Sequence, residues 1–149
     1  MRLVNLKPPI VACLLLALSG GLHFVLPQAY RRQFACGMCG VVAIAIGVGV
    51  LLWAWWLFRK SGTPTRPTAQ ATALVTSGPF RFSRNPMYLA IVALLLGIAV
   101  WVGSLPMLIA PVGFFVVMSL AVIPAEERRL RETFGEAYLS FTQRVRRWV

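Results

Sequence analysis

The chain has 149 residues, of which 58% are hydrophobic and 13% charged, and its mean hydropathy is +0.75. A soluble domain carries about twice this charged fraction, so the composition excludes an ordinary soluble fold. The formal net charge of +11 would also suit a nucleic-acid-binding protein. The basic residues, however, flank long apolar segments, where anionic lipid headgroups account for them. We therefore expect a lipid bilayer, and no nucleic acid, as the partner.

Long apolar segments predict four membrane helices. A helix crosses the hydrocarbon core in about 20 residues, and the apolar segment over 87–123 is too long for one crossing. The sequence Gly-Ser-Leu-Pro at 103–106 predicts a turn that divides it. Lipid-exposed open sheet is excluded from the bilayer. The expected fold is an all-α, polytopic membrane protein with a single domain over 1–149 and helices over about 9–26, 34–58, 87–102 and 105–123.

The first segment has an alternative interpretation as a secretory signal peptide. Arg2 and Lys7 precede an apolar stretch over 10–18, as in the first two regions of such a peptide. The apolar stretch continues to Leu26 without a clear cleavage sequence, which favours a helix that is kept. Whether the first helix is retained stays open at this point.

The basic residues are divided unevenly between the two ends of the expected helices. One end has only Arg31 and Arg32. The other end has the amino-terminal basic residues, those of the loop over 59–86, and those after the fourth helix: Arg2, Lys7, Arg59, Lys60, Arg66, Arg81, Arg84, Arg128, Arg129, Arg131, Arg144, Arg146 and Arg147. The positive-inside rule then predicts that both termini and the 59–86 loop are cytoplasmic. We expect an integral protein of a bacterial inner membrane, with its oligomeric state open.

The last part of the chain has the pattern of an amphipathic helix. Apolar residues recur at spacings of three and four, at Leu130, Phe134, Tyr138, Phe141, Val145 and Trp148. Such spacing places them on one helical face. We expect one helix over 125–148 that either lies along the cytoplasmic interface as an anchor or folds over the ends of the membrane helices.

The second apolar segment contains a cysteine pair and several glycines. Cys36 and Cys39 have redox or metal spacing, but without a second pair or a nearby histidine we expect buried structural thiols and no metal. The glycines Gly37, Gly40, Gly47 and Gly49 thin this helix. They predict close packing against another helix rather than a ligand site.

The start of the third helix gathers polar groups at a membrane edge. Gly78 and Pro79 predict a turn. Asn85 is a natural N-cap, and Pro86 in the first turn needs no backbone donor. Arg84 and Tyr88 flank this positive helix end, which would suit an anionic or oxygen-rich ligand.

Glu126 supplies the opposite charge at the end of the fourth helix. A tight hairpin of the third and fourth helices would bring Glu126 to the same membrane edge as Arg84. Polar groups at such a place are costly unless they are paired or used. The two residues could form a ligand site, or merely an interfacial ion pair, and the residues alone do not choose.

Two segments resemble a known family. They read Leu-Val-Thr-Ser-Gly-Pro-Phe over 74–80 with Arg-Asn-Pro-Met-Tyr over 84–88, and Glu-Glu-Arg-Arg-Leu through Phe-Gly-Glu-Ala-Tyr over 126–138. In this order, separated by one helical hairpin, they resemble the isoprenylcysteine carboxyl methyltransferases and the related phospholipid methyltransferases. The resemblance covers residues 72 to 141, about half of the chain.

The resemblance implies an integral-membrane enzyme that moves a methyl group from S-adenosylmethionine to a lipophilic or small hydrophobic acceptor and releases S-adenosylhomocysteine. It implies catalytic roles for Arg84, Asn85 and Glu126. The positions that match the family's cofactor-binding residues are Thr72, Ala73, Leu74, Val75, Gly78, Phe80, Asn85, Pro86, Met87, Tyr88 and Glu126. Glu126 is expected to bind cationic or hydroxyl parts of the cofactor.

Two positions depart from the prenylcysteine pattern. Asn85 stands where those members have histidine, and asparagine cannot titrate near neutrality. Val122 stands where eukaryotic members have an arginine that faces the substrate. A neutral or amine-bearing lipid, or a small hydrophobic thiol, is therefore as good an acceptor as prenylcysteine. Other classes also remain open, namely a non-catalytic membrane scaffold of the same family, a small membrane transporter, and a membrane reductase.

Overall fold

The computed structural model describes residues 7–30, 33–61 and 74–149. Every regular element in these ranges is helical, which confirms the all-α prediction. The helices are α1 (Pro8–Val25), α2 (Gly37–Lys60), α3 (Pro86–Val102), α4 (Ile109–Val117), α5 (Ile123–Phe134) and α6 (Glu136–Arg144). Three short 3₁₀ turns and one π-helical turn connect them, namely η2 (Gln28–Tyr30), η3 (Gly78–Arg81), η4 (Leu105–Leu108) and η5 (Met118–Val122).

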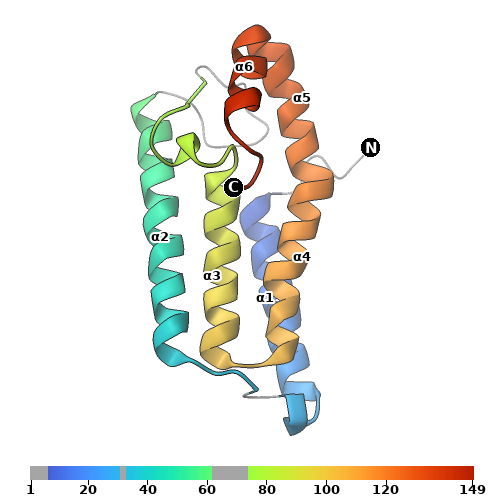
Figure 1. The fold of residues 1–149 in the computed structure, drawn as a ribbon. Helices are drawn as coiled ribbons and strands as arrows, with labels where there is room; N and C mark the ends of the chain where they lie inside the picture. The colour runs from blue at the N-terminus through green and yellow to red at the C-terminus, as the bar shows by residue number, and fades with distance from the viewer. Residues whose placement is uncertain (1–6, 31–32, 62–73) are drawn as a thin grey trace.

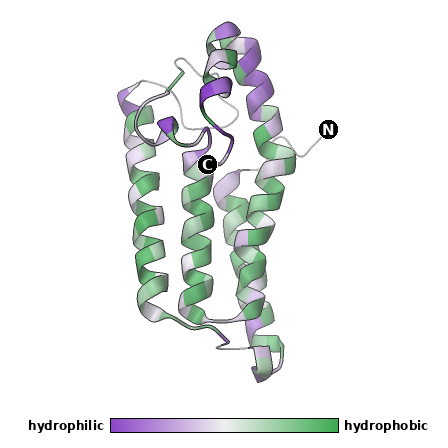
Figure 2. Cartoon of the chain, in the orientation of Figure 1, coloured by the Kyte–Doolittle hydropathy of each residue, from purple (hydrophilic) through white to green (hydrophobic). Residues whose placement is uncertain are grey.

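Among the residues that the structure describes, three helices are long and apolar enough to cross a membrane. They are α1, α2 and the continuous helix over Leu105–Phe134, and the shorter apolar helix α3 lies between them. Figure 2 shows hydrophobic residues over most of these helices and hydrophilic residues concentrated on α5, α6 and the turn before α3. The apolar helices begin and end within about three residues of the predicted limits, except where the fourth continues beyond 123. The chain is thus an integral membrane protein by length and composition of its helices.

The predicted turn between the third and fourth helices is confirmed. Gly103 follows α3 in the left-handed conformation, with φ of 71°, and η4 leads into α4. Ser104 in this turn is fully buried, and its hydroxyl lies 2.8 Å from His23 Nδ1 of α1. This contact ties the end of α1 to the turn, so α3 ends beside the end of α1, and α4 returns to the end of the bundle where α1 begins (Figure 1).

Helices α2 and α3 approach each other closely through glycine. A Cβ atom at Gly47 would lie 2.8 Å from the Ala90 carbonyl oxygen, and one at Gly40 would lie 2.7 Å from the Trp101 nitrogen. Such backbone contacts leave no room for a side chain. The packing prediction is confirmed for Gly40 and Gly47. It is wrong for Gly49, which has nothing within 4 Å of its Cβ position.

The end of the chain differs from the prediction of one helix over 125–148. The apolar helix that begins at η4 and α4 continues through η5 into α5 without a break, and the chain then bends at Gly135, where φ is 49°. Glycine adopts this conformation at no steric cost, so the helix ends there and α6 folds back. The predicted apolar face is nevertheless buried, since Tyr138 and Phe141 pack with residues of α2 and η3. The structure therefore favours folding over the helix ends rather than a separate surface anchor.

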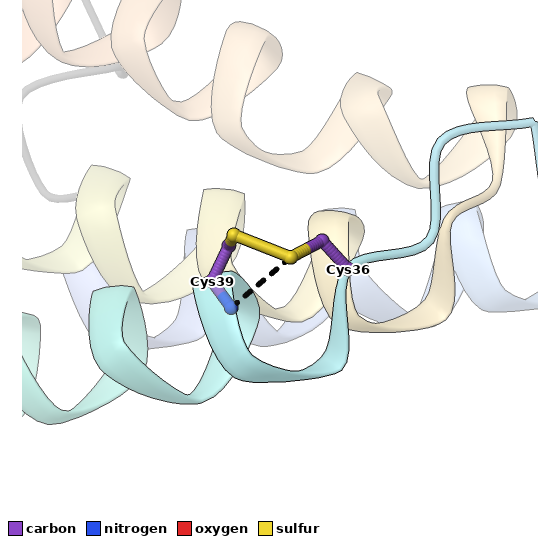
Figure 3. Close-up of a disulfide and its surroundings, with 2 residues drawn as sticks. All are labelled: Cys36 and Cys39. Carbon is purple, nitrogen blue, oxygen red and sulfur yellow. Dashed lines mark hydrogen bonds between the residues drawn. A yellow bond between two sulfur atoms is a disulfide. The ribbon is translucent and has the colours of Figure 1, made fainter.

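The prediction of buried structural thiols is wrong for Cys36 and Cys39. Their Cα atoms are 5.3 Å apart at the start of α2 and the sulfur atoms are joined as a disulfide (Figure 3). This separation is typical of disulfides. Cys39 is exposed and Cys36 is half-buried. The pair lies at the end of the bundle opposite α5 and α6.

Candidate active site at the charged end of the bundle

The turn before α3 is fixed to the end of α2. Gly78 has φ of 60°, and a Cβ atom there would lie 2.6 Å from Leu57 Cδ1 of α2. Phe80 is 6% exposed and meets Phe58 edge-on, with ring centroids 5.2 Å apart. These contacts hold η3 over α2 and bring the next residues to the start of α3.

Asn85 stands at the N-cap position of α3, as predicted, but its side chain does not cap the helix. The Ser83 hydroxyl instead accepts a hydrogen bond from the Asn85 backbone N–H at 3.1 Å. The Asn85 side-chain amide donates to the Arg147 carbonyl at 3.0 Å. The expected side-chain cap is therefore wrong, because the amide is turned toward the end of the chain. Pro86 occupies the first turn as predicted.

Tyr88 and Glu126 join α3 to α5. The Tyr88 hydroxyl donates to Glu126 Oε1 at 2.6 Å, and both side chains are partly buried. The Tyr88 ring also lies edge-on to Phe114 of α4, with centroids 6.4 Å apart. A short hydrogen bond to a carboxylate is among the stronger kinds. It fixes the direction of the Glu126 carboxylate beside an apolar cluster.

Arg84 pairs with Glu127 rather than with Glu126. Arg84 Nη1 lies 3.1 Å from Glu127 Oε1, and Arg147 makes a bidentate contact with the same carboxylate at 3.0 and 2.6 Å. The simple ion pair of Arg84 with Glu126, left open by the sequence, is thus not formed. Glu127 is 9% exposed, so its charge needs both arginines. The hydrogen bond with Glu127 raises the pKa of Arg147, so this guanidinium stays a cation.

The residues before Trp148 lie across the start of α3. The Arg84 backbone N–H donates to the Arg146 carbonyl at 3.0 Å, and the Ser83 hydroxyl donates to the Arg147 carbonyl at 3.3 Å. Sequence reasoning missed Glu127 and Arg147 as a connected pair. No fixed spacing relates a glutamate on α5 to an arginine after α6, so only the shortage of acidic residues could have drawn attention to it.

The predicted cofactor-binding residues have different surroundings in the structure. Leu74, Val75, Phe80 and Met87 belong to one apolar cluster, which also contains Tyr138 of α6. Burial raises the pKa of Tyr138, and the nearby Glu127 carboxylate adds to this shift. Tyr88 and Glu126 form the pair described above, while Asn85 faces the 146–147 backbone and Gly78 faces α2. Thr72 and Ala73 lie outside the described residues.

One buried donor in the turn before α3 lacks a hydrogen-bond partner. Arg84 Nε is buried and has no hydrogen-bond acceptor among the residues that the structure describes. A buried donor that forms no hydrogen bond costs about 1–3 kcal/mol, and more when the group is charged. A ligand with a carboxylate or another oxygen acceptor would satisfy it. The described residues contain no cluster of His, Cys, Asp and Glu that could hold a metal ion.

Comparison with known proteins gives a family match. The family model of the phospholipid methyltransferases matches residues 35–137, which include Arg84, Tyr88, Glu126 and Glu127. An uncharacterized protein of Haemophilus influenzae is 33% identical over 63 residues, which cover 42% of this chain and all of that protein. No solved structure matches the chain. The family match ends before Arg147 and Trp148.

Proposed function

This chain belongs to the phospholipid methyltransferase family, and we propose that it is an S-adenosylmethionine-dependent methyltransferase of the membrane. The family match carries this proposal because it spans the turn before α3, the start of α3 and the start of α5, which supply Arg84, Tyr88, Glu126 and Glu127 to the charged end of the bundle. The proposed acceptor is a lipophilic molecule that enters from the bilayer. The proposed topology has four crossings with both termini on the cytoplasmic side of a bacterial inner membrane.

The residues at this end fit the chemistry of S-adenosylmethionine. The cofactor has a carboxylate, an ammonium group, ribose hydroxyls and a flat adenine ring. The unpartnered Arg84 Nε suits the carboxylate. Glu126, oriented by Tyr88, suits a cationic or hydroxyl group. The apolar residues around Phe80 and Met87 suit a ring.

The chain's residues would contribute positioning rather than covalent chemistry. When bound, S-adenosylmethionine supplies a methyl group on a sulfonium sulfur. The protein must hold the acceptor in line with that group and exclude water, and alignment alone can supply about 7–11 kcal/mol of the barrier. Asn85 cannot act as a base because an amide does not titrate near neutrality. Any proton of the acceptor would therefore leave to another group or to water.

The proposal is tested by ligand binding. S-adenosylhomocysteine should raise the thermal midpoint of the purified protein, because a ligand that binds only the folded state stabilises it. NADPH should leave the midpoint unchanged. Stabilisation by NADPH alone would favour the reductase interpretation, and stabilisation by neither ligand would favour a non-catalytic scaffold.

Glu126 can be tested by a matched pair of substitutions. Glu126→Gln removes the charge but keeps the shape, and we expect the Kd for S-adenosylhomocysteine to rise about tenfold to hundredfold, as for a lost charged hydrogen bond. Glu132→Gln, at an exposed position of the same helix, should leave Kd unchanged. Calorimetry that finds equal affinity in Glu126→Gln and in the native chain would reject the role of Glu126.

A further inference from the structure

The residues Val145–Trp148 form a segment that returns from α6 to the membrane helices, and we call it the return segment. Figure 1 shows it running from α6 back toward the start of α3. Its carbonyl groups at Arg146 and Arg147 accept hydrogen bonds from Arg84, Ser83 and Asn85. These contacts use backbone atoms, so they fix the path of the segment and not only one side chain.

Glu127 fixes the same segment through a side chain. Its carboxylate receives two hydrogen bonds from Arg147 and a third contact from Arg84 of the turn before α3. Since Glu127 lies on α5 and is nearly buried, one residue links three parts of the chain. Removing one partner of a buried ion pair leaves an uncompensated charge, which is strongly unfavourable. The return segment is therefore anchored at Arg147.

Trp148 extends from this anchor along the fourth helix. Its ring lies against Phe115, with centroids 4.6 Å apart and planes inclined at 32°. Phe115 precedes Glu127 by more than three helical turns, or about 18 Å. Trp148 thus reaches from the charged end toward the apolar part of the bundle. It packs on the apolar cluster that also includes Tyr88 and Phe114.

The surface formed by Trp148 and Phe115 is exposed on the outside of the helix bundle. Phe115 is 41% exposed although Trp148 covers part of it, and Trp148 itself is half-buried. Exposed apolar groups on a membrane helix face acyl chains. A lipid that brings its reacting group to the charged end would leave its hydrocarbon chain beside α4, where Trp148 and Phe115 form the surface.

We infer that Trp148 is a specificity-determining residue whose indole contacts the hydrocarbon chain of the methyl acceptor, and that Arg84, Glu127 and Arg147 are positioning residues that hold it there. This inference rests on the proposed function. It adds an acceptor-side surface made by a segment outside the family match. Trp148 is therefore a place where this chain can select an acceptor independently of the cofactor-binding side.

The first experiment measures acceptor choice with labelled S-adenosylmethionine and host lipid extract as the acceptor pool. The variants are Trp148→Ala, Trp148→Phe and, as a control, Trp56→Ala, an exposed tryptophan of α2 at the same end of the bundle. In Trp148→Ala we expect the KM for lipid to rise about tenfold, as for loss of a packed aromatic group, and the chain-length profile of labelled products to change. The Kd for S-adenosylhomocysteine should stay within about twofold of the native value.

The outcomes separate this inference from the proposed function. Trp148→Phe should restore most of the native profile, and Trp56→Ala should match the native chain. If the native protein is active and Trp148→Ala has the same KM and product profile, the inference about Trp148 is overturned while the proposed function stands. A native protein that labels no lipid overturns the proposed function, and the acceptor role of Trp148 with it.

A second experiment tests the positioning residues without any turnover. The contribution of Trp148 to fluorescence is obtained as the difference between the native chain and Trp148→Phe in vesicles of brominated phosphatidylcholine. We expect bromine on the acyl chains to quench this contribution. In the Glu127→Gln background, where the same difference is taken with and without Trp148→Phe, we expect less quenching and an emission maximum shifted to the red. Glu136→Gln, at an exposed position of α6, is the control. Equal quenching in Glu127→Gln and in the native chain would reject the positioning role, and an unquenched Trp148 in the native chain would reject its placement beside lipid.

Discussion

The two sides of α3 are built in different ways. Toward α2 the contact is made by backbone atoms, because Gly40, Gly47 and Gly97 allow the helices to approach within van der Waals distance. Toward α4 and α5 the contact is made by side chains, and at the charged end it includes Tyr88 with Glu126. A close backbone contact tolerates little adjustment, whereas polar side chains can exchange partners. We conclude that α2 fixes the position of α3 through close backbone contacts, whereas the polar contact of α3 at the charged end is made toward α5.

The largest expected effect on stability is at Glu127. Glu127→Ala leaves Arg84 and Arg147 without their shared carboxylate, and we expect a loss of about 3 kcal/mol in the free energy of unfolding, the low end for a broken buried pair. The low end applies because Arg147 is partly exposed and water can solvate it. Chemical denaturation in detergent measures the loss. Glu132→Ala on the same helix should change stability by less than about 0.5 kcal/mol, and equal effects of the two substitutions would contradict the buried pairing.

The next largest effect on stability is expected at the close contact between α2 and α3. Gly47→Ala places a methyl group against the Ala90 carbonyl and the Leu94 nitrogen, and we expect a loss of about 2 kcal/mol from overpacking. Gly49→Ala, two residues away with open space around it, should gain up to about 1 kcal/mol from helix propensity. Thermal unfolding of both variants gives the comparison. If Gly47→Ala is as stable as Gly49→Ala, α2 and α3 are not in close backbone contact.

The smallest expected effect is at the opposite end of the bundle. The disulfide of Cys36 and Cys39 closes a short loop within the first turn of α2, and short loops gain little from cross-linking. Cys36→Ser with Cys39→Ser should lower the free energy of unfolding by about 1 kcal/mol. The affinity for S-adenosylhomocysteine should not change, since the pair lies far from the charged end. A loss of affinity in this double variant would show that the two ends are coupled.

The helices of this chain could be predicted from sequence, but the partners of its polar side chains could not. Long apolar segments and the Gly103 turn determine where α1 to α4 begin and end, because the bilayer sets helix length and only few residues can form the turn. The path after Glu127 could not be predicted. Helical spacing continues through Gly135, so the pattern predicts one helix where the structure has two.

The candidate site shows the same limit. Asn85, Tyr88 and Glu126 could be identified as residues at one membrane edge, because local capping signals and the hairpin place them there. Which carboxylate pairs with Arg84 depends on long-range geometry, and the structure assigns Glu127. Asn85 has the sequence of a helix cap, yet its side chain bonds to a carbonyl 62 residues away along the chain. No local pattern contains that information.

The most direct test of the proposed function is transfer of a labelled methyl group. Purified protein in vesicles is incubated with labelled S-adenosylmethionine and host lipid extract, and in parallel with a small hydrophobic thiol, and the lipid-soluble label is counted. We predict labelled product with the native chain. With Glu126→Gln at limiting cofactor, we expect the amount of labelled product to fall by about tenfold or more. Label no higher than in protein-free vesicles, with every lipid fraction and with the thiol, would contradict the assignment of this protein as a methyltransferase.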